Sequence, residues 1–578
     1  MTKEFETKLR ELREAKGIMP ATIDEYPGIM RGSCTNWENR TRGKITGRNL
    51  VKKRGFRPKK SYNRSESRKK TRFRPGIACV SLPCSGIISL QLFLKEGILM
   101  ALDNIVARTE EIRRLQDALQ ENKAQLIVLY GRRRVGKTWL ITEYFDNQFD
   151  FKMTGSYKEK KDVQLQNFAE ALCFQTNKAI EQPKNWTAAF WQLRRYLSDL
   201  PKEEKHVVFF DEMPWLDTPR SGFLSAFEHF WNDFGCTMHN LVFIVCGSAT
   251  SWISKHIEKN RGGLFRRQTC SIYLKPFTLG ETEEYLKSRG IQWSRYDIAE
   301  CYMILGGIPF YLSLLNRNRS LTDNIDSLLF KKRAELWNEF HQLYHTLFTN
   351  SDQYIRIVEE LSKKKVGLTR QELLQRLKIA DNGKMTEMLK NLENSGFVRV
   401  ETFFGKQKKD LHYQLCDYFT MFYFRFLNKP GRDEHFWTHF YGSNEKRTWA
   451  GLTFEQVCKD HIPQIKWKMS IGGILSEEYT WETKGDEDTP GAQIDLLIDR
   501  KDHVINLCEI KYAEDQFTIN KEYEASLRSK MEVFRNNTQT KKTIQIVMIT
   551  TYGIKENKYS NMISNQILLD DLYYTEGV

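Results

Sequence analysis

The stretch GRRRVGKT, residues 131–138, combines residue types and a spacing that suit phosphate binding. Gly131 and Gly136 permit tight turns that aim backbone N–H groups at phosphate oxygens. Lys137 supplies a cation for the terminal phosphates, and the Thr138 hydroxyl is a ligand for Mg²⁺. We therefore predict that this loop binds ATP together with Mg²⁺. The intervening residues need only contribute backbone amides, which leaves the arginine side chains free to point elsewhere; these residues are Arg132, Arg133, Arg134 and Val135.

Two carboxylates end a second apolar stretch, HVVFFDE, residues 206–212. Asp211 stands where such folds hold Mg²⁺ through water, and Glu212 is suited to orient and deprotonate an attacking water. Ser248, at the end of a third apolar stretch, could sense the γ-phosphate, although a serine that satisfies strand-end backbone groups is the alternative. Together with the glycine-rich loop, this pair predicts ATP hydrolysis.

A further set of charged residues lies in the last part of the chain. Asp495 sits in AQIDLLIDR, and Glu509 and Lys511 sit in HVINLCEIKYAE. Alternation along a strand places Glu509 and Lys511 on one face. Two carboxylates can hold Mg²⁺ while the lysine polarises water or a phosphate, as in metal-dependent nucleases. Glu455, on the expected helix 451–462, is a candidate fourth member, and an ion-paired sheet edge is the alternative interpretation.

The elements around the first two motifs predict an α/β fold. Residues 109–121 have apolar side chains on one helical face, with Thr109 as the expected N-cap. Residues 124–130, 206–212 and 240–248 are short apolar runs typical of buried parallel strands. A helix follows the loop after Lys137. Strands separated by helices predict a parallel sheet with helices on both faces.

The middle of the chain predicts helices followed by a small sheet. Residues 276–345 have helical character, and residues 354–415 contain three amphipathic helices, two strand-like runs and the basic hairpin GKQKKD. Thr369 is a natural N-cap and Gly396 a natural helix stop. This order is typical of a winged helix, whose third helix can enter the DNA major groove. That helix carries nearly balanced charge, so DNA binding and packing against the ATPase both stay open; its charged residues are Asp381, Lys384, Glu387, Lys390 and Glu393.

The net charge of +16 belongs almost entirely to one end of the chain. Residues 1–99 contain 23 Lys and Arg against 9 Asp and Glu, and the block 40–74 has one acid, Glu66. Such a stretch cannot bury enough apolar surface to fold alone. Three interpretations stay open: a nucleic-acid tether, a solvated tail, or a natural start at Met100.

Cysteine usage and hydropathy exclude several classes of protein. The 11 cysteines are scattered without a CxxC pair, which argues against zinc ribbons and a secreted disulfide framework. The most apolar run, residues 86–102, is interrupted by Lys95 and Glu96. We expect a cytoplasmic protein with no membrane partner.

Seven motifs occur in the order seen in the archaeal-type ATPase family, a branch of the AAA+-related STAND ATPases. They are NIVARTEEIRRL, GRRRVGKT, VVFFDE, CGSATSW, GGLFRR, LKPFTLGE and LGGIP. The resemblance covers about residues 100–430. It implies that Arg108 approaches the adenine end and that Arg266, or else Arg267, stabilises the γ-phosphate charge. It also implies that Gly307 and Pro309 line the nucleotide from a helical lid.

The C-terminal set resembles the restriction-endonuclease-like PD-(D/E)xK superfamily, which archaeal-type ATPases often carry. The chain departs from its commonest pattern because Ile494, rather than proline, precedes the aspartate. The resulting expectation has five parts, in chain order. They are a basic extension (1–99), a P-loop ATPase core (100–275), a helical lid (276–345), a winged helix (346–428) and an α/β nuclease-like domain (429–578).

Two functions follow from these expectations. The first is an ATPase that couples Mg-ATP hydrolysis to a nuclease-like domain acting on DNA. The alternative is a STAND-type regulatory switch that binds protein partners, or its own copies, with an inactive nuclease-like domain.

Overall fold

The computed structural model describes residues 104–248, 250–258, 264, 267–406, 410–428, 433–485 and 491–575. The chain divides into two units, residues 1–82 and 83–578, and every element below belongs to the second. The basic extension 1–99, Arg266 and hairpin residues 407–409 lie outside the described residues, so the predictions on them stay predictions.

A five-stranded parallel sheet carries the first two motifs, in the order β2-β3-β4-β1-β5. Its strands are β1 (Gln125–Tyr130), β2 (Phe151–Thr154), β3 (His206–Asp211), β4 (Leu241–Gly247) and β5 (Cys270–Tyr273). Its helices are α4 (Thr109–Gln120), α5 (Lys137–Tyr144), α6 (Lys161–Thr176), α7 (Trp186–Ser198), α8 (Phe223–Asp233) and α9 (Thr250–Ile253). The predicted parallel sheet is confirmed.

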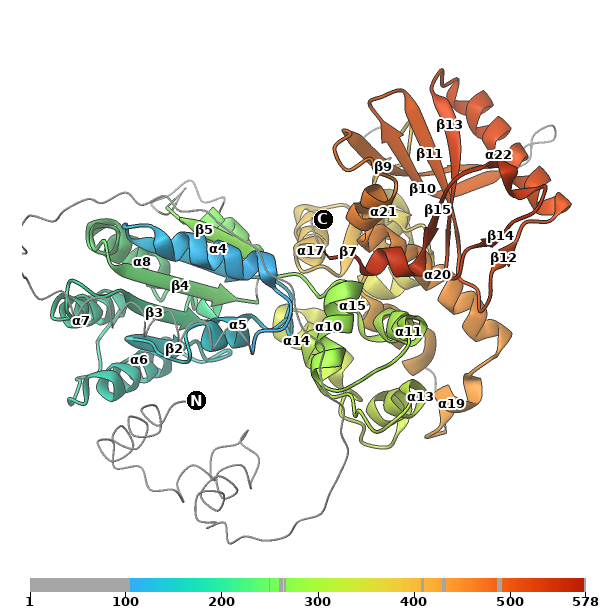
Figure 1. Ribbon diagram of the computed structural model, residues 1–578. Helices are drawn as coiled ribbons and strands as arrows, with labels where there is room; N and C mark the ends of the chain where they lie inside the picture. Colours follow the sequence, from blue (N-terminus) through green and yellow to red (C-terminus); the bar gives the residue numbers. More distant parts are fainter. Residues whose placement is uncertain are drawn as a thin grey trace, which may run out of the picture. The chain divides into compact units, whose positions relative to one another are not determined.

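Both faces of this sheet are covered because its central strands are apolar on both sides. On β1, Ile127 and Leu129 pack into one apolar cluster, while Leu126 and Val128 pack into another. Helices α4 and α5 contribute to the first cluster, and α6, α7 and α8 contribute to the second, so they flank the sheet in Figure 1. The carboxyl ends of β1, β3 and β4 therefore meet at one edge, where the candidate residues stand.

The predicted N-cap at Thr109 is wrong. Thr109 is the first residue of α4, and Arg108 precedes it with φ 66° and no side-chain cap. The Arg108 guanidinium instead donates to the carbonyl of Val135 at 3.1 Å. The residue before this helix is thus held by a tertiary contact, which no local pattern reveals.

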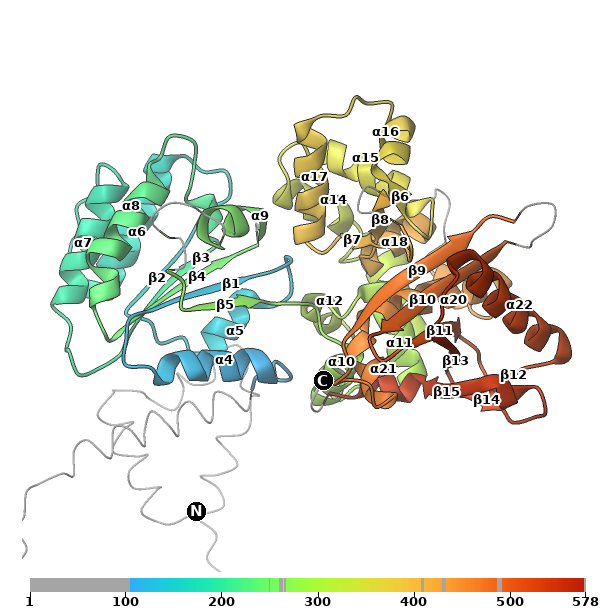
Figure 2. The same cartoon turned by 90° about the horizontal axis from the view of Figure 1, so that it is seen from above.

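The expected helical segment follows the sheet. Its helices are α10 (Leu279–Ser288), α11 (Arg295–Leu305), α12 (Pro309–Ser313), α13 (Leu321–Ile325) and α14 (Glu339–Leu347). A second group, here called the 351–415 module, contains α15 (Ser351–Ser362), β6 (Leu368–Thr369), α16 (Arg370–Leu377), α17 (Gly383–Asn394), β7 (Val398–Glu401) and β8 (His412–Leu415). The three strands pair in the order β6-β8-β7 (Figure 2). Thr369 caps α16 through a capping box, and Gly396 follows α17 at φ 73°, as predicted.

A mixed five-stranded sheet forms the C-terminal part, in the order β15-β13-β11-β10-β9. Its strands are β9 (Ser476–Thr483), β10 (Ala492–Arg500), β11 (Val504–Lys511), β13 (Thr543–Thr550) and β15 (Ile563–Leu568), with a separate parallel pair of β12 (Phe517–Thr518) and β14 (Ile554–Lys555). The helices are α18 (Tyr418–Phe422), α19 (Phe436–Phe440), α20 (Asn444–Asp460), α21 (Ile462–Lys468) and α22 (Lys521–Thr538). The predicted strands at 492–500 and 503–514 are present.

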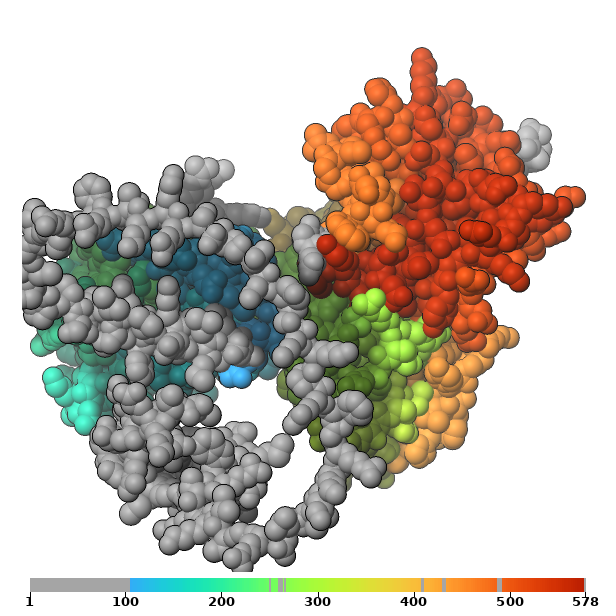
Figure 3. All heavy atoms as spheres, viewed as in Figure 1, coloured from blue at the N-terminus to red at the C-terminus, as the bar shows by residue number. Residues whose placement is uncertain are grey.

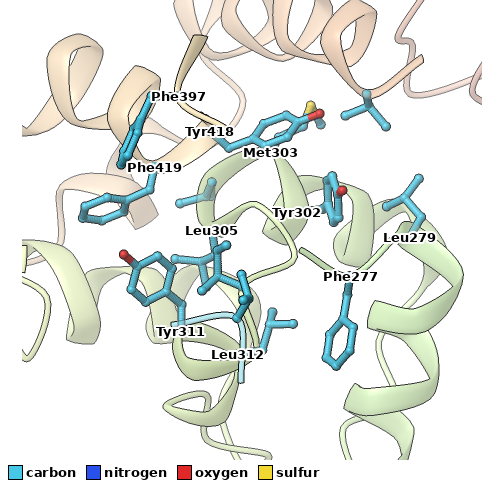
Figure 4. Packing of buried hydrophobic residues seen from close by; sticks show 14 of the residues in the cluster. Phe277, Leu279, Tyr302, Met303, Leu305, Tyr311, Leu312, Phe397, Tyr418 and Phe419 are labelled. Carbon is cyan, nitrogen blue, oxygen red and sulfur yellow. The ribbon is translucent and has the colours of Figure 1, made fainter. Parts of the chain in front are cut away.

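One apolar cluster joins the helical segment to the 351–415 module and to the residues that follow it. Tyr311 of α12 packs on Phe419 of α18, with ring centroids 5.2 Å apart, and Tyr302 of α11 meets Tyr418 edge-on at 5.2 Å (Figure 4). In Figure 3 the green atoms of the helical segment adjoin the red atoms of the C-terminal residues. The Tyr573 hydroxyl donates to the carbonyl of Arg295, the first residue of α11, at 2.6 Å. Within the described residues, no helix is both long and apolar enough to traverse a lipid bilayer.

Candidate functional site

The loop between β1 and α5 requires glycine at both predicted positions, for different reasons. A Cβ on Gly131 would lie 2.3 Å from the carbonyl oxygen of Leu274, which directly follows β5, so only glycine fits against that backbone. Gly136 has φ 91°, a left-handed conformation that side chains rarely adopt, and it begins α5. The loop thus opens onto the N-terminus of a helix, where backbone N–H groups and the helix dipole favour anions.

Lys137 is buried, with 5% of its surface exposed. Its Nζ donates to the carbonyls of Gly131 and Arg132 at 3.0 and 2.9 Å, which holds the ammonium inside the loop. Burial lowers the pKa of Lys137, against the opposing effect of Cys246, Glu212 and Asp211. A buried cation at this position can bind the terminal phosphates of a nucleotide.

Thr138 and Asp211 come together from α5 and β3. The Thr138 hydroxyl donates to Asp211 Oδ2 at 2.9 Å, and Asp211 Oδ1 accepts the backbone N–H of Glu212 at 3.0 Å. Burial, followed by the charge of Glu212, raises the pKa of Asp211. Hydroxyl and carboxylate oxygens are the donors that Mg²⁺ prefers, so this pair fits the metal of a Mg-ATP complex.

Glu212 and Ser248 form the second contact at this sheet edge. The Glu212 carboxylate accepts the Ser248 hydroxyl at 2.6 Å and the Ser248 backbone N–H at 3.0 Å. Glu212 itself has φ 46°, a strained conformation for a non-glycine residue. Ser248, for which the sequence leaves both γ-phosphate sensing and a role at the strand end open, donates both of these hydrogen bonds to the Glu212 carboxylate.

The loop arginines hold the loop to distant parts of the chain. Arg132 forms a buried ion pair with Asp417, the N-cap of α18, and lies over the ring of Phe397 with its Cζ 5.1 Å from the centroid. Arg134 binds both carboxylate oxygens of Glu339 at 2.5 and 2.7 Å. Within the described residues, the guanidinium of Arg133 makes no such contact. The side chains of Arg132 and Arg134 are thus engaged with carboxylates outside the loop.

The LGGIP segment lies against the same loop. Gly307 has φ 61°, and a Cβ there would lie 2.2 Å from the Phe277 carbonyl oxygen. Pro309 begins α12, and the backbone N–H of the next residue donates to the Arg134 carbonyl at 3.4 Å. Arg108 packs over Phe277, with its Cζ 4.4 Å from the ring centroid. The structure thus places the LGGIP segment and Arg108 beside the loop 131–138, while Arg267 is exposed and Arg266 lies outside the described residues.

The C-terminal candidates separate into two groups. Asp495 on β10 and Glu455 on α20 share the ammonium of Lys365, from the loop between α15 and β6. Glu509, on β11, accepts from Lys511, Lys530 and the Tyr523 hydroxyl at 2.7–2.9 Å; the latter two lie on α22.

Glu509 and Lys511 do share a face, as predicted, but Asp495 and Glu509 hold different lysines. No group of three or more His, Cys, Asp or Glu side chains is placed to hold a metal ion in the part of the chain described. In this conformation lysine ammonium groups, rather than a shared metal site, lie beside the predicted C-terminal carboxylates.

Several contacting residues escaped sequence reasoning because only tertiary packing brings them to the sites. Asp417 and Glu339 lie 285 and 205 residues from the arginines that they bind, and Lys365 lies 130 residues from Asp495. The sequence contains one indirect indication of these contacts: three adjacent arginines in a phosphate-binding loop need acidic residues elsewhere in the chain to pair with.

Comparison with known proteins agrees with this geometry. Residues 105–315 match a family described as an ATPase domain predominantly from Archaea. An uncharacterized protein of Methanocaldococcus jannaschii is 24% identical over 416 residues, which cover 71% of this chain and 88% of that protein. An uncharacterized ATP-binding protein of the same organism is 52% identical over 52 residues, 9% of this chain and 81% of that protein. A Walker-type ATPase of Pyrococcus abyssi is similar in structure, with 18% identity, a TM-score of 0.41 and coverage of 56% of this chain and 97% of its own.

Proposed function

The chain belongs to the family of ATPase domains found predominantly in Archaea, and on that premise we propose that it hydrolyses Mg-ATP at residues 131–138 and passes the nucleotide state to its C-terminal half. The loop amides and Lys137 bind the phosphates. Thr138 and Asp211 hold the Mg²⁺ that arrives with ATP and that neutralises charge on the phosphates.

Glu212 is the proposed catalytic base. Water attacks the γ-phosphorus, the bond from phosphorus to the β–γ bridging oxygen breaks, and the water proton passes to the Glu212 carboxylate. The two hydrogen bonds from Ser248 set the direction of that carboxylate. Ser248 is therefore a positioning residue.

Three contacts support the transmission of the nucleotide state. Arg132 ties the phosphate loop to Asp417 at the start of α18, and Arg134 ties it to Glu339 at the start of α14. On the other side, α9 begins two residues after Ser248, and its Ser251 hydroxyl accepts from the Asn394 amide of α17 at 3.4 Å. The observation that carries the proposal is the pair of arginine contacts, one fully buried (Arg132–Asp417) and one partly buried (Arg134–Glu339), because a loop that moves with bound phosphate must move both arginines too.

The 351–415 module is proposed to be a winged helix that couples to the ATPase. Its third helix, α17, has the Asn394 contact with α9 and the Asn394 carbonyl within 3.5 Å of the Tyr273 hydroxyl. Both contacts are with the ATPase core, which favours the coupling role over reading of DNA by this helix. The regulatory switch of STAND type, with protein partners, is thus the interpretation that the contacts of α17 favour.

A metal-dependent nuclease acting on DNA is the second candidate for the C-terminal domain. It is favoured by one observation: Glu455 and Asp495 converge from α20 and β10, although they are 40 residues apart in sequence. Plasmid DNA incubated with Mg²⁺ and the full chain tests it. Nicking that is lost in Asp495→Ala supports the nuclease, and intact plasmid at all ATP concentrations contradicts it.

Steady-state ATP hydrolysis by the full chain tests the main proposal. Glu212→Gln should lower kcat by about 10²- to 10⁴-fold with KM changed little, because general base catalysis contributes that much. Lys137→Ala should abolish ATP binding. Glu203→Gln, an exposed glutamate just before β3, is the matched control and should hydrolyse ATP normally. Equal rates in Glu212→Gln and the control would contradict the assignment.

A further inference from the structure

Lys365 occupies the place between two carboxylates that a cation would take. Its Nζ lies 3.1 Å from Asp495 Oδ1 and contacts Glu455 Oε2. Asp495 Oδ1 also accepts from the Gln493 amide at 2.6 Å. The lysine comes from the 351–415 module, whereas both carboxylates come from the C-terminal α/β part. The contact therefore joins two parts of the chain that the proposed function couples.

Each of the three charged groups affects the pKa values of its neighbours in this contact. Burial and the neighbouring Asp495 raise the pKa of Glu455 to about 7. Burial alone would lower the pKa of Lys365, but the charges of Asp495 and Glu455 raise it. Two carboxylates this close repel each other when both are ionised, and a single cation between them relieves the repulsion. Lys365 supplies that cation from within the chain.

The backbone around Lys365 belongs firmly to the module. Its carbonyl accepts the Gln414 side-chain amide of β8 at 2.7 Å. The next-but-one residue, Gly367, has φ 80°, and a Cβ there would lie 2.6 Å from the Tyr413 carbonyl oxygen. Because the lysine is anchored in this way, it must leave the carboxylates when the module moves away from the C-terminal part.

A cleft adjoins the contact. Its volume is about 770 Å³, and its lining includes Lys365, Gln414, Trp449, Glu455, Lys459 and Asp495. A volume of this size is typical of small-molecule sites, which measure roughly 300–1,000 Å³. The carboxylate pair therefore faces a space that a ligand could enter.

We propose that Lys365 is an internal counter-cation: its ammonium occupies the space between the Glu455 and Asp495 carboxylates and prevents a divalent cation from binding there. When Lys365 withdraws, a divalent cation can bind between the two carboxylates. The inference rests on the proposed coupling of the module to the ATPase, and it accounts for the position of Lys365 between two carboxylates of the predicted metal-dependent site. If the ion pair only stabilised the fold, removal of the Lys365 ammonium would destabilise the protein and would not create a site that binds a metal ion.

Calorimetric titration of the nucleotide-free full chain with Mn²⁺ tests the proposal. Lys365→Met removes the ammonium but keeps the aliphatic stem, and it should bind one Mn²⁺ at least tenfold more tightly than the wild type. The double variant Lys365→Met/Asp495→Asn should lose that gain. Lys363→Met is the matched control, because this nearby lysine pairs with Glu360 and Glu359 instead, and it should behave as the wild type.

Unchanged Mn²⁺ affinity in a folded Lys365→Met protein would overturn the proposal. If that variant fails to fold, Lys365→Gln takes its place, because its amide is uncharged but can still donate a hydrogen bond that supports the local structure; it too should bind Mn²⁺ more tightly than the wild type, and an unchanged affinity would overturn the proposal. The wild-type chain provides a measurement without any substitution: a carbodiimide should crosslink Lys365 to Glu455 or Asp495, and millimolar Mn²⁺ should reduce the yield. A yield that Mn²⁺ does not change would also overturn it.

ATP hydrolysis, measured on the same wild-type preparation, separates the two proposals. Hydrolysis without the Mn²⁺ response would refute the role of Lys365 alone. The Mn²⁺ response without hydrolysis would refute the ATPase proposal but would still support the proposed role of Lys365.

Discussion

The ion pair between Arg132 and Asp417 offers the sharpest energetic prediction. Both side chains are almost fully buried, with 4% and 2% exposed. Asp417 also caps α18, where its Oδ2 accepts the Thr420 backbone N–H at 3.0 Å and the Thr420 hydroxyl at 2.6 Å. Asp417→Asn removes the charge and keeps a side chain that caps helices equally well. The change in unfolding free energy caused by this substitution therefore measures the contribution of the Arg132–Asp417 ion pair.

The expected cost follows from what the substitution leaves behind. The guanidinium of Arg132 would stay buried without a counter-charge, and its Nε and Nη2 already make no hydrogen bond within the described residues. Removal of one partner of a buried pair typically costs about 3–5 kcal/mol. Because Arg132 belongs to the phosphate loop, ATP affinity should fall as well.

Urea unfolding followed by tryptophan fluorescence measures this cost, with Asp233→Asn as the control. Asp233 pairs with Arg194 at 2.5 Å, but the two side chains are 52% and 46% exposed. An exposed pair contributes only about 0–1 kcal/mol, so the control should lose correspondingly little. Equal losses in the two variants, or a stable Asp417→Asn protein with normal ATP affinity, would refute the assignment of Arg132 as a buried tether.

Three further outcomes are expected. Gly131→Ala should cost about 1–3 kcal/mol and weaken ATP binding, since its Cβ meets the Leu274 carbonyl, whereas Gly472→Ala, which meets nothing within 4 Å, should do neither; thermal unfolding and nucleotide titration compare them. Ser248→Ala should lower kcat about tenfold with KM unchanged, because loss of one orienting hydrogen bond costs on the order of 1–1.5 kcal/mol; an altered KM instead would point to direct nucleotide contact. The raised pKa of Glu455, about 7, means that the folded state binds this proton more tightly than the unfolded state, so its stabilisation is full below pH 4.5 and is lost as the pH rises through 7. Glu455→Gln should therefore gain up to about 3 kcal/mol on the wild type between pH 5 and pH 8, and a pH-independent difference in unfolding free energy would contradict this.

Local patterns in the sequence predicted the elements whose stability is local or whose burial is complete. The run AQIDLLIDR coincides with β10, and Thr369 caps α16 because the residues that form its capping box lie within one turn. Strands β2 and β5 were missed. Each has four residues, includes polar side chains and lies at an edge of the sheet, so neither shows a continuous apolar run.

The phosphate loop could be predicted because all its functional groups are contiguous in sequence. Its partners could not, since Arg132 and Asp417 meet only after the helical segment and α18 pack into one core. The same holds for Lys365. Charge spacing grouped Asp495 with Glu509 and Lys511, whereas the structure pairs Asp495 with Lys365, and nothing in the sequence indicates which lysine, out of many, lies beside it.

Hydrogen–deuterium exchange of the Glu212→Gln protein, with and without Mg-ATP, tests the central claim that nucleotide binding is transmitted to the C-terminal half. This variant should bind ATP without turning it over, so the bound state persists during exchange. The account predicts altered exchange in α17 and in residues 361–368, as well as in the phosphate loop, and no change in Lys137→Ala at the same ATP concentration. Altered exchange confined to the phosphate loop and its immediate neighbours, with α17 unaffected, would contradict it.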